Sequence, residues 1–331
     1  MKKIISLLMT IILTSALFVG CNSSDKTVSE EPIPEAIDIN IGGLKGPTSM
    51  GMVKLMEEAE EGEGANNYSF TIAGSPDDLT PKLIKGELDI AAVPVNLASI
   101  LYNNTEGKVQ LLAVNTLGVL YLVERGEAVQ TVQDLKGKTI IASGKGSTPE
   151  YTLNYILKEN GIDPEKDVTI EWKSEHTEVV SALAQKEAAV ALLPQPFVTV
   201  AESSLKDLRT AVDLTEEWEA LDNGSQLITG VLVVRREFAK ENPEQLKSFL
   251  KEYSESTAYV NENVEEAANL VEKFDIIKAA VAVKAMPYCN ITYLDGAEMK
   301  GAVEGFLEVL YNQNPKSVGG KLPGEDFYYG N

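Results

Sequence analysis

The chain has 331 residues, of which 44% are hydrophobic and 24% are charged, a balance typical of a folded globular protein. Its length corresponds to about two ordinary domains. The formal net charge of −21 argues against nucleic acid and anionic membranes as partners, because the overall field repels both. The net charge does not constrain a single local pocket.

The first twenty residues differ from the rest of the chain. Lys2 and Lys3 precede an apolar run that ends at Val19, and a polar stretch rich in Ser, Glu and Pro follows. This pattern predicts a secretory signal peptide over residues 1–20, because the apolar run is too short for a membrane span and a helix here would have nothing to pack on. We interpret residues 21–37 as a flexible tether, since they carry no hydrophobic period.

Cys21 closes a segment that resembles a bacterial lipobox, although Phe18 stands where that motif usually has an aliphatic residue. The resemblance implies a mature chain that begins at a lipidated Cys21. Cys289 is then the remaining cysteine, so an intramolecular disulfide is excluded. A nucleophilic Cys289 would need the single histidine, His176, as its base, and we expect a buried, inert thiol instead.

From residue 38 onward, runs with strand and helix periods alternate. The predicted strands of the first part are DINIGG (38–43), YSFTIAG (68–74), LDIAAVP (88–94) and VQLLAVNT (109–116). Helices are predicted in 50–61, near 77–86 and from Asn96. This alternation predicts an α/β fold with a largely parallel sheet that has helices on both faces.

A second unit with the same order opens at Thr131. Its predicted strands are KTIIAS (138–143), DVTIEW (167–172) and the apolar run AAVALLP (188–194). A helix is predicted from Pro149 to Gly161, where glycine permits a left-handed end, and another over 177–187. The remaining chain passes through GVLVVRREF (230–238) into helical patterns, which we expect to cover the first sheet.

One four-residue pattern occurs twice, as KGPT at 45–48 and as KGST at 145–148. At the same offset of one hundred positions, LIKGELDIAAVPVN (83–96) aligns with LAQKEAAVALLPQP (183–196), with identical Leu, Glu, Ala and Pro residues. A repeat of this length is not a solenoid period, so we interpret it as two related lobes.

Both copies of the pattern lie between a predicted strand and a predicted helix. Ligands of open parallel sheets bind at this edge, where backbone N–H groups at a helix start point outward. Thr48 and Thr148 are predicted N-caps, and Gly46 and Gly146 permit a close approach of backbone and ligand. Capping alone would also explain either loop, but two such loops, one in each lobe, favour a clamp that closes around a small ligand.

With these motifs together, the chain resembles the extracytoplasmic substrate-binding proteins of ABC importers, in the nitrate, sulfonate, taurine and thiamine-precursor branch. The segments that carry the resemblance include GGLKGPTSMGMVKLM, GSPDDLTPKLIKGELDIAAVP, GKTIIASGKGSTPEYTLNYILKENGI and EVVSALAQKEAAVALLPQPF. The resemblance implies a two-lobed periplasmic-binding-protein-like fold of type II, with a ligand cleft between lobes joined by two crossovers. We expect lobe 1 to comprise 38–122 and 233–331, and lobe 2 to comprise 123–232.

The resemblance also implies the function and the partners. The protein would be a monomeric receptor without catalysis, cofactor or metal, held outside the cytoplasmic membrane by its lipid. It would bind one small organic ligand, either sulfonate-like or taurine-like or a heterocyclic thiamine precursor, and deliver it to a permease with its ATPase. Nucleic acid is not an expected partner.

Carried over residue by residue, the resemblance places ligand-binding residues in the loops at the cleft. In the first lobe these are Lys45, Pro47, Thr48, Ser49, Ser75, Pro76 and Asn96, and in the second lobe Gly146, Ser147, Thr148, Glu150 and Gln195. Glu150 either completes a capping box with Ser147 or meets an amine or ring nitrogen of the ligand.

Arginines and aromatic residues bear on the ligand's chemistry. Arg125, Arg235 and Arg236 fall near the crossovers, so an anionic ligand would depend on Lys45, Lys145 and backbone donors. Several aromatic residues near the cleft could stack on a ring, namely Tyr121, Tyr151, Phe197, Tyr288 and Tyr293.

Two other function classes remain open. The same fold could serve a surface sensor or adhesin, or a precursor-synthesis enzyme. The residue count argues against an enzyme, because a hydrolase triad or a histidine metal site needs more than one histidine and one mature cysteine. The segment LDNGS (221–225) is too short for a calcium loop.

Overall fold

The computed structural model describes residues 35–186 and 189–330. The predicted signal peptide, Cys21 and most of the predicted tether lie outside these residues. Residues 35–37 belong to the fold, because the Asn67 N–H donates to the Ile37 carbonyl at 2.9 Å and the Gln245 side chain donates to the Glu35 carbonyl at 3.1 Å. Across the described ranges, no helix is long and apolar enough to cross a membrane.

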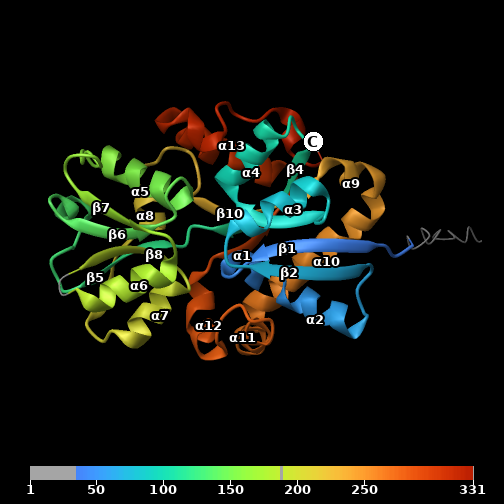
Figure 1. The fold of residues 1–331 in the computed structure, drawn as a ribbon, viewed down its shortest axis with the longest axis horizontal. Coiled ribbons are helices and arrows are strands. Elements are labelled where there is room, and N and C mark those ends of the chain that lie inside the picture. Colours follow the sequence, from blue (N-terminus) through green and yellow to red (C-terminus); the bar gives the residue numbers. More distant parts are fainter. Residues whose placement is uncertain (1–34, 187–188, 331) are drawn as a thin grey trace, which may run out of the picture. The chain divides into compact units, whose positions relative to one another are not determined.

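The described strands form a six-stranded and a five-stranded sheet (Figure 1). The first sheet has the order β11-β4-β10-β3-β1-β2 and the second the order β7-β6-β8-β5-β9. The strands of the first sheet are β1 (Asp38–Leu44), β2 (Asn67–Ala73), β3 (Ile90–Pro94), β4 (Val109–Leu117), β10 (Ile228–Arg235) and β11 (Ile291–Leu294). Those of the second are β5 (Leu120–Arg125), β6 (Thr139–Ser143), β7 (Thr169–Lys173), β8 (Val190–Pro194) and β9 (Leu208–Asp213).

The expected parallel pairing holds for only part of each sheet. β1 runs parallel to β2 and β3, and β6 runs parallel to β7 and β8. However, β10 is antiparallel to both of its neighbours, as is β5. The prediction of a largely parallel sheet is wrong at these two strands and at β11, which is antiparallel to β4. β5 and β10 each follow a strand of the other sheet, so neither is joined to its neighbours by the strand-helix-strand crossover that parallel pairing requires.

The two sheets share one topology. Each strand of the second sheet has a counterpart at the same place in the first. The counterparts are β1 and β6, β2 and β7, β3 and β8, β10 and β5, and β4 and β9, and β11 is an additional strand at the edge of the first sheet. β3 and β8 begin one hundred positions apart, as the aligned sequence blocks predict. The repeat found in the sequence is therefore a repeat of sheet architecture.

The chain passes between the two sheets twice. The first crossover is Gly118–Val119, and the second runs through α8 (Leu214–Ala220) and residues 221–227. The expected boundaries at 122/123 and 232/233 are displaced, because residues 120–122 pair within the second sheet and 228–232 within the first. Both switching strands are apolar along most of their length, so their sequences do not mark where the chain changes lobes.

Helices cover both sheets (Figure 1). Those between the first strands and in the second lobe are α1 (Pro47–Met50), α2 (Val53–Glu61), α3 (Thr80–Lys85), α4 (Val95–Asn104), α5 (Thr148–Glu159), α6 (His176–Gln185) and α7 (Phe197–Ser204). The C-terminal part contains α9 (Arg236–Glu241), α10 (Pro243–Glu262), α11 (Val264–Lys273), α12 (Ala279–Ala285) and α13 (Gly296–Gln313), with β11 between the last two. Buried residues of α10 and α11 pack against β1 and β3, so the expected return to the first sheet is confirmed.

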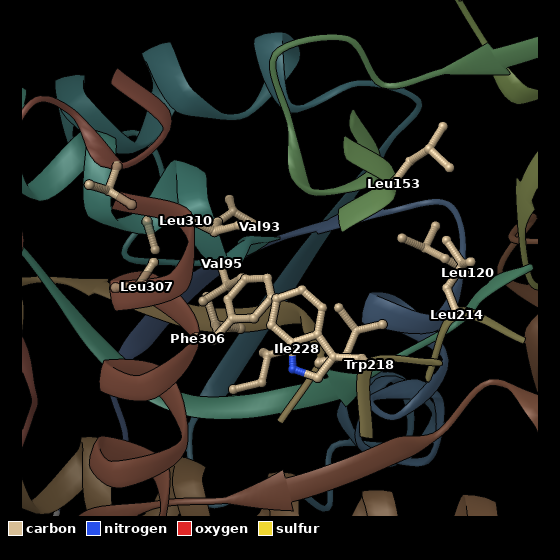
Figure 2. Packing of buried hydrophobic residues seen from close by; sticks show 14 of the residues in the cluster. Val93, Val95, Leu120, Leu153, Leu214, Trp218, Ile228, Phe306, Leu307 and Leu310 are labelled. Atoms are coloured by element: carbon tan, nitrogen blue, oxygen red, sulfur yellow. The ribbon is translucent and has the colours of Figure 1, made fainter. Parts of the chain in front are cut away.

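One buried hydrophobic cluster joins the two lobes. Trp218 of α8 lies beside Phe306 of α13, with ring centroids 5.2 Å apart, and beside Tyr155 of α5, at 4.8 Å. Figure 2 shows Trp218 together with Phe306, Val95 and Ile228 in the same cluster. The indole Nε1 donates to Ser225 Oγ at 3.1 Å. The segment LDNGS therefore supports this packing, which fixes α5 and α8 against the first lobe.

Candidate ligand site between the lobes

The two copies of the repeated pattern lie at the carboxyl ends of β1 and β6, but in turns of different length. β1 ends at Leu44 and α1 begins at Pro47, whereas β6 ends at Ser143 and α5 begins at Thr148. Ile41 pairs with Ile90 in the first sheet and Ile140 with Val190 in the second, so equivalent strand residues are 99 positions apart. The second turn therefore has two additional residues, and the matching letters do not occupy matching places.

The expected N-caps are wrong. Gly46 and Ser147 occupy the cap positions, so Thr48 and Thr148 lie inside their helices. Thr48 Oγ1 donates to the Leu44 carbonyl at 3.4 Å, whereas Thr148 Oγ1 donates to Asn96 Oδ1 at 3.2 Å. α1 begins one residue before Thr48 and α5 begins at Thr148, and proline occupies one of the first two helical positions in both copies.

The expected capping box of Ser147 and Glu150 does not form. The Ser147 hydroxyl donates to the Gly144 carbonyl at 2.9 Å, and the Glu150 carboxylate accepts the Gly146 N–H at 2.5 Å. The glutamate still receives a backbone N–H near the helix start, where a negative charge is favourable. Lys145 and Glu150 line an open groove of about 1040 Å³ on the second lobe, together with Trp172.

Asn96 and Thr148 form a buried polar contact between the lobes. Asn96 is 1% exposed and Thr148 is 2% exposed. In addition to accepting the Thr148 hydroxyl, Asn96 donates through Nδ2 to the Ser317 carbonyl at 3.2 Å. The structure thus brings together one predicted site residue from each lobe, and their contact holds α4 against the start of α5.

Other predicted site residues make local contacts. Ser75 Oγ accepts the Asp77 N–H at 3.3 Å and caps the short helix that Pro76 begins. Gln195 Oε1 accepts both the N–H and the hydroxyl of Thr199, at 3.3 and 3.0 Å. These side chains secure the turns that lead into the helices.

The short helix α1 carries the next group of predicted residues. The Thr48 carbonyl accepts a hydrogen bond from Asn115 Nδ2 at 3.1 Å, which ties α1 to β4. Ser49, two residues after Pro47, is fully buried, and its hydroxyl has no partner among the described residues. The helix is therefore anchored by its backbone, and the Ser49 hydroxyl retains its hydrogen-bonding capacity.

A cavity of about 440 Å³ lies between the lobes. Lys45 and Gly46 contribute the first-lobe turn, and α6, α7 and the segment after α11 contribute the remaining walls. The residues that line it are Lys45, Gly46, Thr177, Val180, Pro196, Phe197, Val200, Ile276 and Ile277. Lys45 Nζ forms an ion pair with Asp275 Oδ2 at 2.7 Å on the same segment. Of the predicted site residues, Lys45 lines this cavity.

The sequence reasoning missed most of these walls. Some of them lie in helices and form no motif with their neighbours, namely Thr177, Val180 and Val200. The others follow α11 without a recognisable motif, namely Asp275, Ile276 and Ile277. Of the five aromatic residues expected near the cleft, Phe197 is the one that lines the cavity. Tyr121 and Tyr293 direct their hydroxyl groups to the Tyr288 carbonyl and to Asp295.

His176 lies at the edge of the same region. Its Nδ1 is 2.6 Å from Ser143 Oγ, and its ring packs on Phe197 with centroids 4.9 Å apart. Burial lowers the pKa of His176 from 6.5 to about 4, so the imidazole is neutral at pH 7. Burial also raises the pKa of the Cys289 thiol to about 12, as expected for an inert cysteine.

The arginines are engaged elsewhere, as the sequence indicated. Arg125 pairs with Asp207 at 2.9 Å, Arg235 with Asp89 at 2.7 Å and Arg236 with Asp326 at 2.9 Å. None of the three lines the interlobe cavity. Within the described residues, no group of three or more His, Cys, Asp or Glu side chains could hold a metal ion.

Two sheets of equal topology, two crossovers and a cavity between the lobes define a two-lobed α/β binding protein of the periplasmic type. The family described as the phosphonate periplasmic substrate-binding protein of ABC transporters matches residues 60–288. The chain belongs to this family. The resemblance to ABC substrate-binding proteins seen in the sequence is therefore confirmed at the level of the family.

Individual proteins show the same relationship at low identity. A binding protein of Brucella abortus strain 2308 is 24% identical over 210 residues, which cover 62% of this chain and 63% of that protein. The chain thus spans less than two thirds of the length of this curated relative.

Solved structures extend the match to most of the chain. An ABC transporter protein of Parabacteroides distasonis has a TM-score of 0.73 at 24% identity, covering 88% of this chain and 98% of the other. The aliphatic sulphonate binding protein SsuA of Escherichia coli has a TM-score of 0.69 at 18% identity, covering 88% and 96%. These likenesses establish the two-lobed fold.

Proposed function

We propose that this protein is the solute-binding receptor of an ABC importer, which captures one small organic ligand between its lobes and delivers it to a permease and its ATPase. The observation that carries the proposal is the cavity of about 440 Å³ whose walls come from both lobes. Its volume lies in the range of about 300–1,000 Å³ that is usual for small-molecule sites. A ligand in this cavity would contact both lobes and favour their closed arrangement.

A binding role is favoured over a catalytic one by the state of the reactive side chains. His176 is neutral and bonded to Ser143, and the Cys289 thiol is fully buried. Ser143 and His176 lie within hydrogen-bonding reach of each other, as a nucleophile and its base must, but Ser143 is only 2% exposed and is therefore closed to a substrate. Support for transport as opposed to sensing or adhesion comes from the family to which the chain belongs.

The finer parts of the proposal rest on the sequence. Lipidation of Cys21 after removal of residues 1–20 would hold a monomeric receptor at the outer face of the cytoplasmic membrane, beside its permease. Ligands to consider first are sulfonates, including taurine, and heterocyclic thiamine precursors. Phe197 offers a ring for stacking, and Lys45 offers one positive charge.

Thermal unfolding in the presence of a compound panel tests the proposal. The panel contains sulfonates, phosphonates, thiamine precursors, amino acids and amines, and calorimetry follows any compound that raises the Tm. A ligand at one hundred times its Kd should stabilise the folded protein by about 2.7 kcal/mol.

The control variant fills the cavity. Val200→Trp should abolish the shift in Tm while the protein remains folded, because the indole occupies the space between the lobes. A shift caused only by a divalent metal, or one that persists unchanged in Val200→Trp, would contradict the proposed site.

A further inference from the structure

The walls of the interlobe cavity are mostly apolar, with Thr177 as a polar and Lys45 as a charged side chain. Val180, Phe197 and Val200 form one side, and Ile276 and Ile277 form the other. Among the described residues that line it, Lys45 is the one with a charged side chain, and its ammonium group stands beside Asp275. A ligand that fills the cavity therefore needs an apolar body, with its charged groups collected at one end.

That end of the cavity is an ion pair and not a lone cation. Lys45 and Asp275 are 2.7 Å apart, and their side chains are 43% and 96% exposed. Lys45 lowers the pKa of Asp275, which keeps this carboxylate charged at neutral pH. Exposed pairs of this kind contribute little net stability, so a ligand can exchange into this one at small cost.

The carboxylate belongs to the same segment as the apolar wall. Asp275 precedes Ile276 and Ile277 directly, and Lys278, which also acts on Asp275, is paired with Glu272 at 2.9 Å. On the opposite side, the Thr177 hydroxyl donates to Glu175 at 3.3 Å. Lys45 and Asp275 are thus accompanied by a second ion pair, Lys278 with Glu272, that includes a residue of the same segment.

Charge balance separates the classes of ligand. A simple anion at Lys45 would displace Asp275 and place two negative groups beside one lysine, in a chain of net charge −21. A simple cation at Asp275 would leave Lys45 without its partner. A zwitterion can pair with both groups at once.

We propose that the cavity binds a small zwitterion with an apolar body, of the class of apolar α-amino acids, with its carboxylate on Lys45 and its ammonium group on Asp275. The inference rests on the proposed receptor function and specifies the ligand class of that site. Asp275 is then a specificity-determining residue, because it distinguishes a zwitterion from an anion of the same shape.

Four compounds with one apolar body in common test the inference on the folded full chain. L-leucine and L-phenylalanine carry both charges, N-acetyl-L-leucine lacks the positive charge, and L-leucinamide lacks the negative charge. In calorimetry, leucine or phenylalanine should bind, and each single-charge derivative of leucine should bind at least about tenfold more weakly, as expected for a lost charge-assisted hydrogen bond.

Two variants and a matched control locate the effect. Lys45→Met and Asp275→Asn should each weaken binding of the zwitterion by about tenfold or more, with unchanged Tm in the absence of ligand. Lys145→Met is the control, because this lysine belongs to the same sequence pattern but lines the groove on the second lobe. It should leave the affinity unchanged.

The outcomes separate this inference from the proposed function. Binding of N-acetyl-L-leucine as tight as that of L-leucine would overturn the role of Asp275 and assign the site to simple anions. If none of the four compounds binds while another member of the panel does, the zwitterion is wrong and the receptor function stands. Equal effects of Lys45→Met and Lys145→Met would overturn the placement of the ligand at Lys45.

Discussion

The turn after β1 and the turn after β6 carry the same four-residue pattern but make opposite connections. In the first turn, Lys45 reaches Asp275 and lines the cavity between the lobes, while Thr48 bonds within its own turn. In the second turn, Lys145 stays in a groove of its own lobe, while Thr148 crosses to Asn96. The residue of the pattern that lies between the lobes is therefore the lysine in the first copy and the threonine in the second.

The cause is the length of the turns. Two residues separate β1 from α1, and four separate β6 from α5, so each lysine leaves its strand at a different place. A repeat in sequence reproduces the order strand, turn and helix. It does not reproduce the direction of each side chain, because one inserted residue changes the direction in which the following side chains point.

The largest expected effect comes from removing the packing of Trp218, which joins the two lobes. Trp218→Ala should lower the free energy of unfolding by about 3–5 kcal/mol, because it leaves a cavity between Tyr155 and Phe306. Urea denaturation measures the loss. Trp172→Ala is the control, since that ring is partly exposed in the second lobe and should cost less. Equal losses would mean that the cluster does not join the lobes.

A second test uses His176, the single histidine of the chain. The aligned position of the first lobe is Pro76. The pKa of His176 is 6.5 in the unfolded chain and about 4 in the folded protein, so the unfolded state binds the proton first as the pH falls. Stability should therefore be complete above about pH 6.5 and should decrease by about 1–3 kcal/mol toward pH 4.

The histidine variant isolates this contribution. In denaturation curves at several pH values, His176→Gln should lose less stability between pH 7 and pH 4 than the unmodified protein does. Identical pH profiles would show that the imidazole is solvated and that its contact with Ser143 does not hold it neutral.

The two threonines give the most direct comparison. Thr148→Val should cost about 1–3 kcal/mol, because it leaves the buried Asn96 Oδ1 without its donor. Thr48→Val removes a long bond to the Leu44 carbonyl in a partly exposed turn and should cost about 0.5 kcal/mol or less. Urea midpoints of the two variants measure the difference. A larger loss for Thr48→Val would reverse the assignment of the crossing residue.

The smallest effect on stability is expected from the lysines. Lys45→Met should change the free energy of unfolding by no more than about 1 kcal/mol, because its ion pair with Asp275 is exposed. Lys145→Met should change it still less. A thermal-melt comparison at low and high salt checks both, and a loss for Lys45→Met that salt does not reduce would indicate that the pair is structural and not exchangeable.

Much of the local structure was predictable from residue patterns. The run LDIAAVP became β3, the helix expected before Gly161 became α5, and Gly161 takes the left-handed conformation with a φ of 71°. These features depend on a few neighbouring residues and on the conformational freedom of glycine. Asn96 and Thr148 were also identified, but as ligand-binding residues and not as partners of each other.

The rest of the site was beyond local patterns. Lys45 and Asp275 are separated by 230 positions, and nothing near Asp275 marks it as the partner of a lysine. The crossover positions were displaced for a related reason, since β5 and β10 are apolar along most of their length and fit either sheet. Their assignment depends on packing against strands that are distant in sequence.

The sequence by itself determined that this protein has two related α/β units and a binding-protein fold, with a turn of similar composition after β1 and after β6. Only the tertiary structure decided that Thr148 contacts Asn96 of the other lobe, and that Lys45 lines the cavity between the lobes while it pairs with Asp275 of its own lobe. The physical reason is that strands, helices and turns follow from short-range preferences. The faces that meet between the lobes follow from turn length and from the packing around Trp218, Tyr155 and Phe306, which joins segments far apart in the chain.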